Sequence, residues 1–298
     1  MKSSGQLLFK SYSGSSQLEN LTSFGIFLTG DYLERGGFTV GYSFDTLNYM
    51  PDLGSGRRNT YENVLFLSGK SNFYPDLLPG KITLRLDSYL GREKTYSRIN
   101  TPTPGPMGGG TSRQTITVDD KFQAVNPMVS FLNNSKTFYA DMGYAYSRYR
   151  SDDNSTDDID VYQWTPTLGF GFNRTYDWLQ FRAYLINLSS SNRIGDQEST
   201  SALETKWTHW FSADAPLNLH SVRLSLLAGE RVYTIDSDAG SLHNVADLQA
   251  DSVSIGAEWK LSEQTDLLLQ SGYEAYKNVM LNDRYSSVYM YIYLSSRW

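Results

Sequence analysis

The chain ends on SSVYMYIYLSSRW (residues 286–298), where polar and apolar side chains alternate up to a terminal tryptophan. From Val288 to Leu294 every second residue is apolar, and tyrosines occupy the positions between them. Successive side chains of an extended strand point to opposite faces, so this alternation predicts a β-strand with one apolar face and one polar face.

The same two-residue period recurs along the rest of the chain. It is clear in DLLLQSGYEAY (266–276) and SVSIGAEWKL (252–261), and it continues back to GQLLFKSY (5–12). Fourteen segments can be assigned as strands in this way. Two of them contain a proline, Pro127 and Pro166, which removes a ladder hydrogen bond, so we expect a β-bulge near each.

The joins between these segments alternate in length after the first hairpin. Short joins such as NNSK (133–136) and LSEQT (261–265) alternate with long polar joins such as residues 95–114 and 236–251. The short joins therefore share one end of the sheet, and the long joins share the other. Outer-membrane barrels have this asymmetry, with short periplasmic turns and long extracellular loops.

Composition excludes several other classes of protein. The 298 residues include no cysteine, which excludes disulfides, thiol catalysis and covalent haem attachment through CxxCH. A net charge of −6 gives no basic face for nucleic acid. No apolar run approaches the roughly 18 residues of a membrane helix. The start, MKSSGQLLFK (1–10), lacks the apolar region of a signal peptide, so we expect a mature chain or the last domain of a longer one.

These observations predict a single all-β domain over residues 1–298, a transmembrane antiparallel up-and-down β-barrel of about 14 strands. Only helices and closed barrels pair every backbone group within lipid, so the last strand must pair with the first. An even strand number places both termini on the periplasmic side of a bacterial outer membrane. Trp178, Trp210, Trp259 and Trp298 are expected near that interface.

The last strand also resembles the signal that the barrel-assembly machinery of Gram-negative bacteria recognises in outer-membrane β-barrels. The matching positions are Trp298, Leu294, Ile292 and Met290, whereas Ser296 departs from the usual apolar residue. The resemblance covers this strand alone. It implies the barrel-assembly machinery, outer-membrane lipid and lipopolysaccharide as partners.

If the apolar faces point outward, the polar faces line the lumen. The charged residues expected there are Lys10, Asp45, Arg85, Asp87, Asp141, Arg182, Glu204, Lys206, Arg223, Arg231, Glu258, Lys260 and Glu274. Both signs are present in near balance, which predicts a hydrated or salt-bridged interior without strong ion selectivity. Their simplest role is mutual charge satisfaction.

Tyrosines are the other expected lumen residues. They are Tyr89, Tyr184, Tyr233, Tyr276, Tyr289, Tyr291 and Tyr293. Aromatic faces stack on sugar rings, so such a lining suits saccharide-like solutes, although tyrosine is also a common filler of barrel interiors. The favoured function is therefore a channel for hydrophilic solutes or polymers.

Two further functions fit the same residues. The barrel could be the membrane domain of a surface polysaccharide or protein exporter whose periplasmic helical-repeat region is absent, or a scaffold around a partner protein such as a multihaem cytochrome. We expect no enzyme activity, cofactor or metal site: the three histidines form no recognisable catalytic constellation, and the acidic join 151–160 lacks the glycine and glutamate of an EF-hand loop. The Gly- and Pro-rich stretch at 100–114 either enters the lumen or stays outside it.

Overall fold

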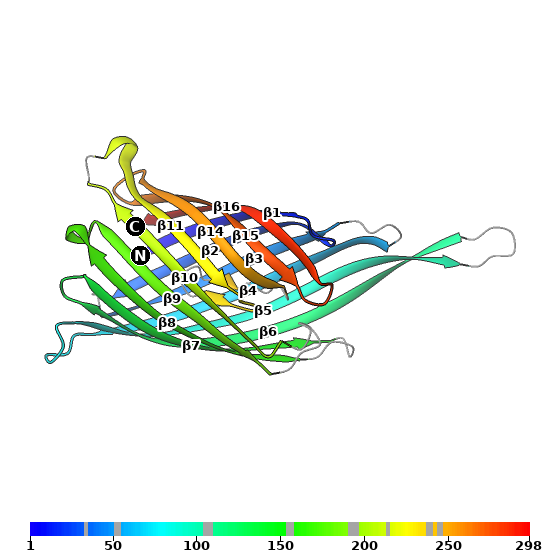
Figure 1. The fold of residues 1–298 in the computed structure, drawn as a ribbon, viewed down its shortest axis with the longest axis horizontal. Coiled ribbons are helices and arrows are strands. Elements are labelled where there is room, and N and C mark those ends of the chain that lie inside the picture. Colours follow the sequence, from blue (N-terminus) through cyan, green and yellow to red (C-terminus); the bar gives the residue numbers. More distant parts are fainter. Residues whose placement is uncertain are drawn as a thin grey trace.

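The computed structural model describes residues 1–32, 35–50, 55–103, 110–152, 158–189, 197–212, 215–236, 241–242 and 247–298, with the backbone alone at 55–57, 98–103, 110–114 and 241–242. Fourteen strands form one closed antiparallel barrel, as predicted (Figure 1). They are β1 (Lys2–Ser13), β2 (Leu18–Tyr32), β3 (Gly36–Tyr49), β4 (Ser55–Phe73), β5 (Gly80–Thr103), β6 (Gly110–Asn133), β7 (Phe138–Ser151), β8 (Ile159–Phe172), β9 (Asp177–Leu188), β10 (Ser199–Trp210), β11 (Leu219–Gly229), β14 (Leu248–Lys260), β15 (Thr265–Asn278) and β16 (Asp283–Arg297).

The final strand closes the barrel. β16 pairs with β15 on one side and with β1 on the other, in continuous register from Lys2 opposite Arg297 to Ser13 opposite Ser286. The terminal ammonium of Met1 also donates to the carbonyl oxygen of Trp298 at 3.0 Å. This closure leaves no open edge strand in the sheet, which is the condition for a sheet to cross lipid.

The outer face of the barrel is apolar along most strands. Met290 and Leu294 are about half exposed, and the same is true of outward residues on neighbouring strands such as Ile26, Leu86 and Ile255. So much contiguous exposed apolar surface is unfavourable in water and is the surface that lipid covers in a barrel of this class. No helix in the described part of the chain is long and apolar enough to span a membrane.

The joins beyond the first hairpin follow the predicted alternation except the last, because residues 279–282 form a short turn where a long join was expected. Both termini and the short joins lie at one end of the barrel, where 3-10 turns connect β8 to β9 (Asn173–Thr175) and β10 to β11 (Pro216–Asn218). The longest predicted join is mostly strand, because β5 and β6 continue as a hairpin beyond the other strands (Figure 1). Residues 104–109, at its tip, lie outside the described residues.

The prediction of bulges at the prolines was wrong. β6 and β7 skip the pairs at Asn126 and Pro127 but keep one register from Asp120 to Leu132, and β8 and β9 behave in the same way around Pro166. Each proline pairs normally with the strand on its other side. A proline that lacks its N–H therefore interrupts one ladder locally without inserting a residue.

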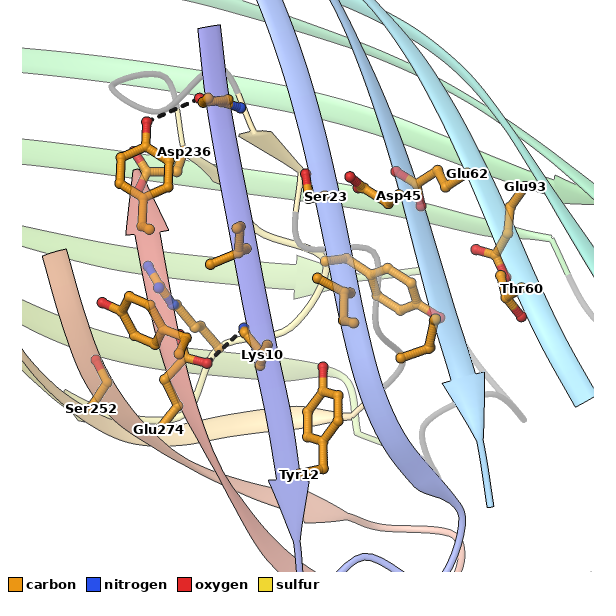
Figure 2. A pocket seen from close by; sticks show the side chains of 18 of the residues that line it. Lys10, Tyr12, Ser23, Asp45, Thr60, Glu62, Glu93, Asp236, Ser252 and Glu274 are labelled. Carbon is orange, nitrogen blue, oxygen red and sulfur yellow. Dashed lines mark hydrogen bonds and ion pairs between the residues drawn. The ribbon is translucent and has the colours of Figure 1, made fainter. Parts of the chain in front are cut away.

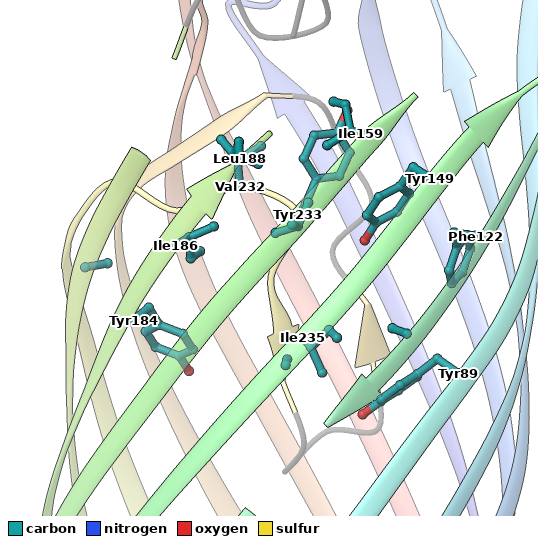
Figure 3. Close-up of a cluster of buried hydrophobic side chains, with 14 of the residues drawn as sticks. Tyr89, Phe122, Tyr149, Ile159, Tyr184, Ile186, Leu188, Val232, Tyr233 and Ile235 are labelled. Atoms are coloured by element: carbon teal, nitrogen blue, oxygen red, sulfur yellow. The ribbon is translucent and has the colours of Figure 1, made fainter. Parts of the chain in front are cut away.

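The inner face contains an apolar patch that the alternation alone does not predict. Ile159 and Val161 on β8 and Ile186 on β9 point inward and are almost fully buried, although outward neighbours such as Trp164 are also apolar. The lumen segment, which we define as residues 230–236, covers this patch (Figure 3). It follows β11 and ends in β12 (Ile235–Asp236), which pairs with β13 (Ser241–Leu242).

Inward glycines accommodate large rings at two places on the inner face, one on β8 and one on β5. A Cβ added at Gly169 would lie 2.5 Å from the indole of Trp178, so this tryptophan packs inside the barrel instead of joining the outer interface as predicted. At Gly91 an added Cβ would lie 1.9 Å from the ring of Phe122. Because glycine has no Cβ, the two rings can lie against the backbone at these positions.

Replacing Gly91 with alanine should therefore lower the free energy of unfolding by about 1–3 kcal/mol, because the ring of Phe122 must leave its position. The measurement is urea unfolding of the refolded barrel in detergent. Gly69→Ala is the matched control, since an added Cβ there has no heavy atom within 4 Å. Equal stability of the two variants would contradict the packing described here.

Candidate functional site in the barrel lumen

A cavity of about 690 Å³ occupies the lumen beside the lumen segment. Its walls come from β1–β7, β10, β11 and β14–β16, with Arg231, Tyr233 and Asp236 of the lumen segment completing it. The apolar aliphatic and phenyl side chains that line it are Leu8, Leu21, Leu47, Val118, Phe122 and Leu268. This volume is in the range of small-molecule sites, roughly 300–1,000 Å³, and the lining combines apolar and charged groups.

A buried ion pair lies on the wall formed by β1 and β15. The Nζ atom of Lys10 is 2.6 Å from Glu274 Oε2, and both side chains are more than nine-tenths buried (Figure 2). Tyr276 Oη is 3.0 Å from Lys10 Nζ and donates to Glu274 at 2.6 Å, and Ser287 Oγ donates to the same carboxylate. Full hydrogen bonding of this kind is what makes a buried charge pair tolerable.

A second part of the wall, which begins two strands away from β1, is acidic. Asp45, Glu62, Glu93 and Asp120 lie directly opposite one another on β3, β4, β5 and β6, and all four line the cavity. Figure 2 shows the first three. Like charges in directly opposed positions disfavour a sheet, so this row is not explained by strand pairing. The charges of the lumen are thus of both signs, as predicted, and four of the carboxylates form one continuous row across β3 to β6.

The sequence analysis missed three members of this acidic row. Glu93 and Asp120 lay outside the predicted strands, because β5 and β6 extend well beyond the usual strand length. Glu62 fell inside a predicted strand but was not assigned to the lumen. In TITVDDKF (115–122) the apolar residues Ile116, Val118 and Phe122 share one face, which is the signal that would have extended β6. REKTYSR (92–98) shows no such alternation.

Two of the tyrosines predicted to line the lumen also line the cavity, with hydrogen-bonded hydroxyls, and a third, Tyr293, contacts a lysine through its ring. Tyr289 Oη accepts from Gln270 Nε2 at 2.9 Å, and Tyr291 Oη donates to Gln6 Oε1 at 3.0 Å; both tyrosines line the cavity. The ammonium of Lys2 lies 5.5 Å from the ring centre of Tyr293, nearer the chain termini.

Three other predicted tyrosines point inward but are packed against protein. Tyr89 is 0% exposed and lies against Phe66, with ring centres 5.0 Å apart. Tyr184 is also 0% exposed, and Tyr276 stacks on Tyr285 at 5.1 Å. These faces are not available for stacking on a solute, so they fill the barrel interior.

Arg231 and Tyr233 reach the lumen by a different route from the one predicted. Both were assigned to a barrel strand, but β11 ends at Gly229, which has a φ of +101°. The chain then turns inward, so the two residues belong to the lumen segment. Val232 and Ile235 pack against apolar residues of the inner wall. This packing stabilises the inward path of the chain more than continued strand pairing would.

The remaining predicted charges form pairs around the inner wall. Arg85 contacts Asp87 at 2.7 Å, Arg182 contacts Asp236 at 3.5 Å, Lys206 contacts Glu204 at 3.8 Å, and Arg223 contacts Glu258. Asp141 is buried on β7. Lys260 lies exposed at the last position of β14 and does not line the cavity.

The acidic join after β7 is neutralised by neighbouring bases. Asp152 faces Lys121 at 3.5 Å, Asp158 faces Arg150 at 4.0 Å, and Asp160 faces Arg148 at 2.7 Å. Asp153 and Asp157 lie outside the described residues. Within the described ranges, no group of three or more His, Asp or Glu residues is arranged to hold a metal ion.

Asp247 connects the rim of the barrel to β15 and β16. It accepts hydrogen bonds from Asn278 Nδ2 at 2.7 Å and from the Tyr285 hydroxyl. Burial raises the pKa of its carboxyl above the ordinary value, and the two hydrogen bonds oppose that shift. Folding therefore favours the protonated form of the Asp247 carboxyl. The stability that this protonation contributes is fully present below the ordinary pKa of an aspartate, and it is lost as the pH rises through the raised pKa.

Lys10→Met should destabilise the barrel by about 3–5 kcal/mol, because it leaves Glu274 buried without its cation. The double variant Lys10→Met/Glu274→Met should recover most of that loss, since it removes both charges. Urea unfolding of the three proteins measures the difference. A double variant no more stable than Lys10→Met would contradict this account of the pair.

Comparison with known proteins supports the fold. No family model matches the chain, and no curated protein matches it. Among solved structures, the Pseudomonas putida toluene transporter TodX aligns with a TM-score of 0.58 at 11% identity, over 100% of this chain and 89% of TodX. A Pseudomonas aeruginosa FadL homologue aligns with a TM-score of 0.53 at 12% identity, over 99% and 88%. At this identity the likeness concerns the fold, which is that of the Gram-negative outer-membrane β-barrels.

Proposed function

We propose that this protein is a channel of the bacterial outer membrane that passes small solutes with an apolar body and a few polar groups. The observation that carries the proposal is the cavity of about 690 Å³ inside a closed barrel, lined by apolar and charged side chains together. A lumen filled only by interlocking side chains would leave no such space.

Placement in the outer membrane is supported by the two ends of the barrel. Both termini lie at one end, and the longest stretches between barrel strands, residues 189–198 and 230–247, lie at the other. By analogy with barrels of this class, the end with the termini faces the periplasm. The exposed apolar side chains of Met290, Leu294 and Trp298 support insertion by the barrel-assembly machinery.

The proposed solute differs from the saccharide expected from the tyrosines. Tyr89, Tyr184 and Tyr276 are packed against protein, whereas leucines from several strands reach the cavity. Proteins of the same fold include TodX, which is described both as a toluene transporter and as a monoaromatic hydrocarbon channel, and the Ralstonia pickettii toluene transporter TbuX. Both observations favour a solute with an apolar or aromatic part.

The exporter and scaffold functions receive no comparable support. A polymer or a haem protein needs more space than a cavity of about 690 Å³ that the lumen segment already bounds. A periplasmic helical-repeat region or a protein partner therefore has no specific observation in its favour.

The test is solute entry into proteoliposomes, followed by osmotic swelling. Liposomes with the refolded protein should swell faster in phenylalanine than in maltotriose, because the first carries an aromatic body and fits the cavity. Liposomes without protein correct for leakage through lipid. Swelling by maltotriose at an equal or higher rate would overturn the proposed solute class, and the absence of swelling in any solute, even after the lumen segment is removed, would overturn the channel.

A further inference from the structure

The inner wall of β7, β8 and β9 is an apolar recess in a lumen that is otherwise rich in charge. Ile159 and Val161 alternate along β8, and Ile186 and Leu188 do the same on β9, with Tyr149 beside them on β7. All five side chains are 7% exposed or less. Without a cover they would face the water of the channel, which is unfavourable for an apolar surface.

The cover is the lumen segment. Val232, Tyr233 and Ile235 are each 3% exposed or less, and Figure 3 shows them directed at the recess. The ring of Tyr233 lies 4.7 Å from the ring of Tyr149, tilted by 43°. The segment thus places an aromatic ring and two branched aliphatic side chains where a solute with an apolar body would bind.

Polar contacts hold the segment in position. Gln163 on β8 donates to the carbonyl oxygen of Ile235 at 2.9 Å and accepts from its N–H at 3.1 Å. Arg231 pairs through its backbone with Gln249, and its guanidinium lies 4.9 Å from the ring of Tyr184. The contacts at Gln163 are made to backbone atoms, so they fix the path of the segment and not the identity of its side chains.

The docked position also carries costs. Tyr233 has a φ of +49°, a conformation that costs a bulky residue about 1 kcal/mol or more. Thr234 Oγ1 and Arg231 Nη1 are buried and have no hydrogen-bond partner in the described part of the chain. Gly229, at the start of the segment, supplies a backbone position that can act as a hinge. Apolar contact with the recess has to offset these costs.

We infer that the recess is a binding site for the aromatic or aliphatic part of the solute, and that the lumen segment occupies it when the channel is closed. A solute that binds the recess competes with Tyr233 and Ile235, and release of the segment enlarges the cavity. The lumen segment is therefore a gate that the solute itself opens. This inference rests on the proposed channel function.

The first test removes the apolar contacts of the gate. The triple variant Val232→Ser/Tyr233→Ser/Ile235→Ser should raise the open probability in planar bilayers about tenfold or more without added solute. The reason is that the docked segment loses the apolar contacts that offset its backbone strain and its unpaired polar atoms. Tyr74→Ser, at an exposed tyrosine in a short join, is the control and should behave as wild type. A heat-dependent shift in electrophoretic mobility verifies that each barrel is folded.

The second test uses a matched pair of cations. Phenyltrimethylammonium should raise the open probability of the wild-type channel, whereas tetramethylammonium, which lacks the ring, should not. Neither cation should affect the triple variant in this way. Equal responses to the two cations would overturn the recess as a site for an aromatic group.

The third test locks the gate. Because the chain contains no cysteine, Gln163→Cys/Ile235→Cys introduces the only two thiols, which a short thiol cross-linker can join. The cross-linked channel should stay closed when phenyltrimethylammonium is added. The same variant without cross-linker has lost the Gln163 hydrogen bonds and the Ile235 side chain, so it should open at least as readily as wild type. If wild type, triple variant and cross-linked protein all conduct alike, the channel stands and the gate is wrong. If all are silent and exclude phenylalanine, the proposed channel itself fails.

Discussion

The structure depends on the pairing of β16 with β1. Lipid offers no hydrogen bonds, so each backbone N–H and C=O at the edge of an open sheet would cost several kcal/mol. The continuous register between the two terminal strands removes both edges at once. Every other feature, including the apolar exterior and the enclosed lumen, presupposes this closure.

Because the barrel is closed, each strand has one face on the outside of the barrel and one face in the lumen. Most of the outward residues are apolar and, in the proposed placement, meet lipid, which a period of two expresses directly. The inward residues meet one another, and their character varies around the barrel. β1 and β15 bury an ion pair, β3 to β6 carry a row of carboxylates, and β7 to β9 carry an apolar recess.

This variation around the lumen ties the fold to the proposed function. A barrel with a uniformly polar interior would give no reason for a segment to leave the rim and enter the lumen. Here the recess supplies the reason, because it buries Tyr233 and Ile235 while Gln163 satisfies the backbone. The apolar surface that holds the segment is also the surface to which an apolar solute would bind.

The sequence by itself determined the strand number, the alternation of short and long joins, and the closed barrel, because each follows from local periodicity and from backbone hydrogen bonding in lipid. It placed Tyr289 and Lys10 on the inner face for the same reason. Only the tertiary structure decided which inner residues meet. The contacts of Gln163 with Ile235, and of Glu62 with its neighbours across the sheet, join parts of the chain whose proximity no local pattern encodes. Alternation specifies the face of a strand, whereas register and the path of the lumen segment specify its partners.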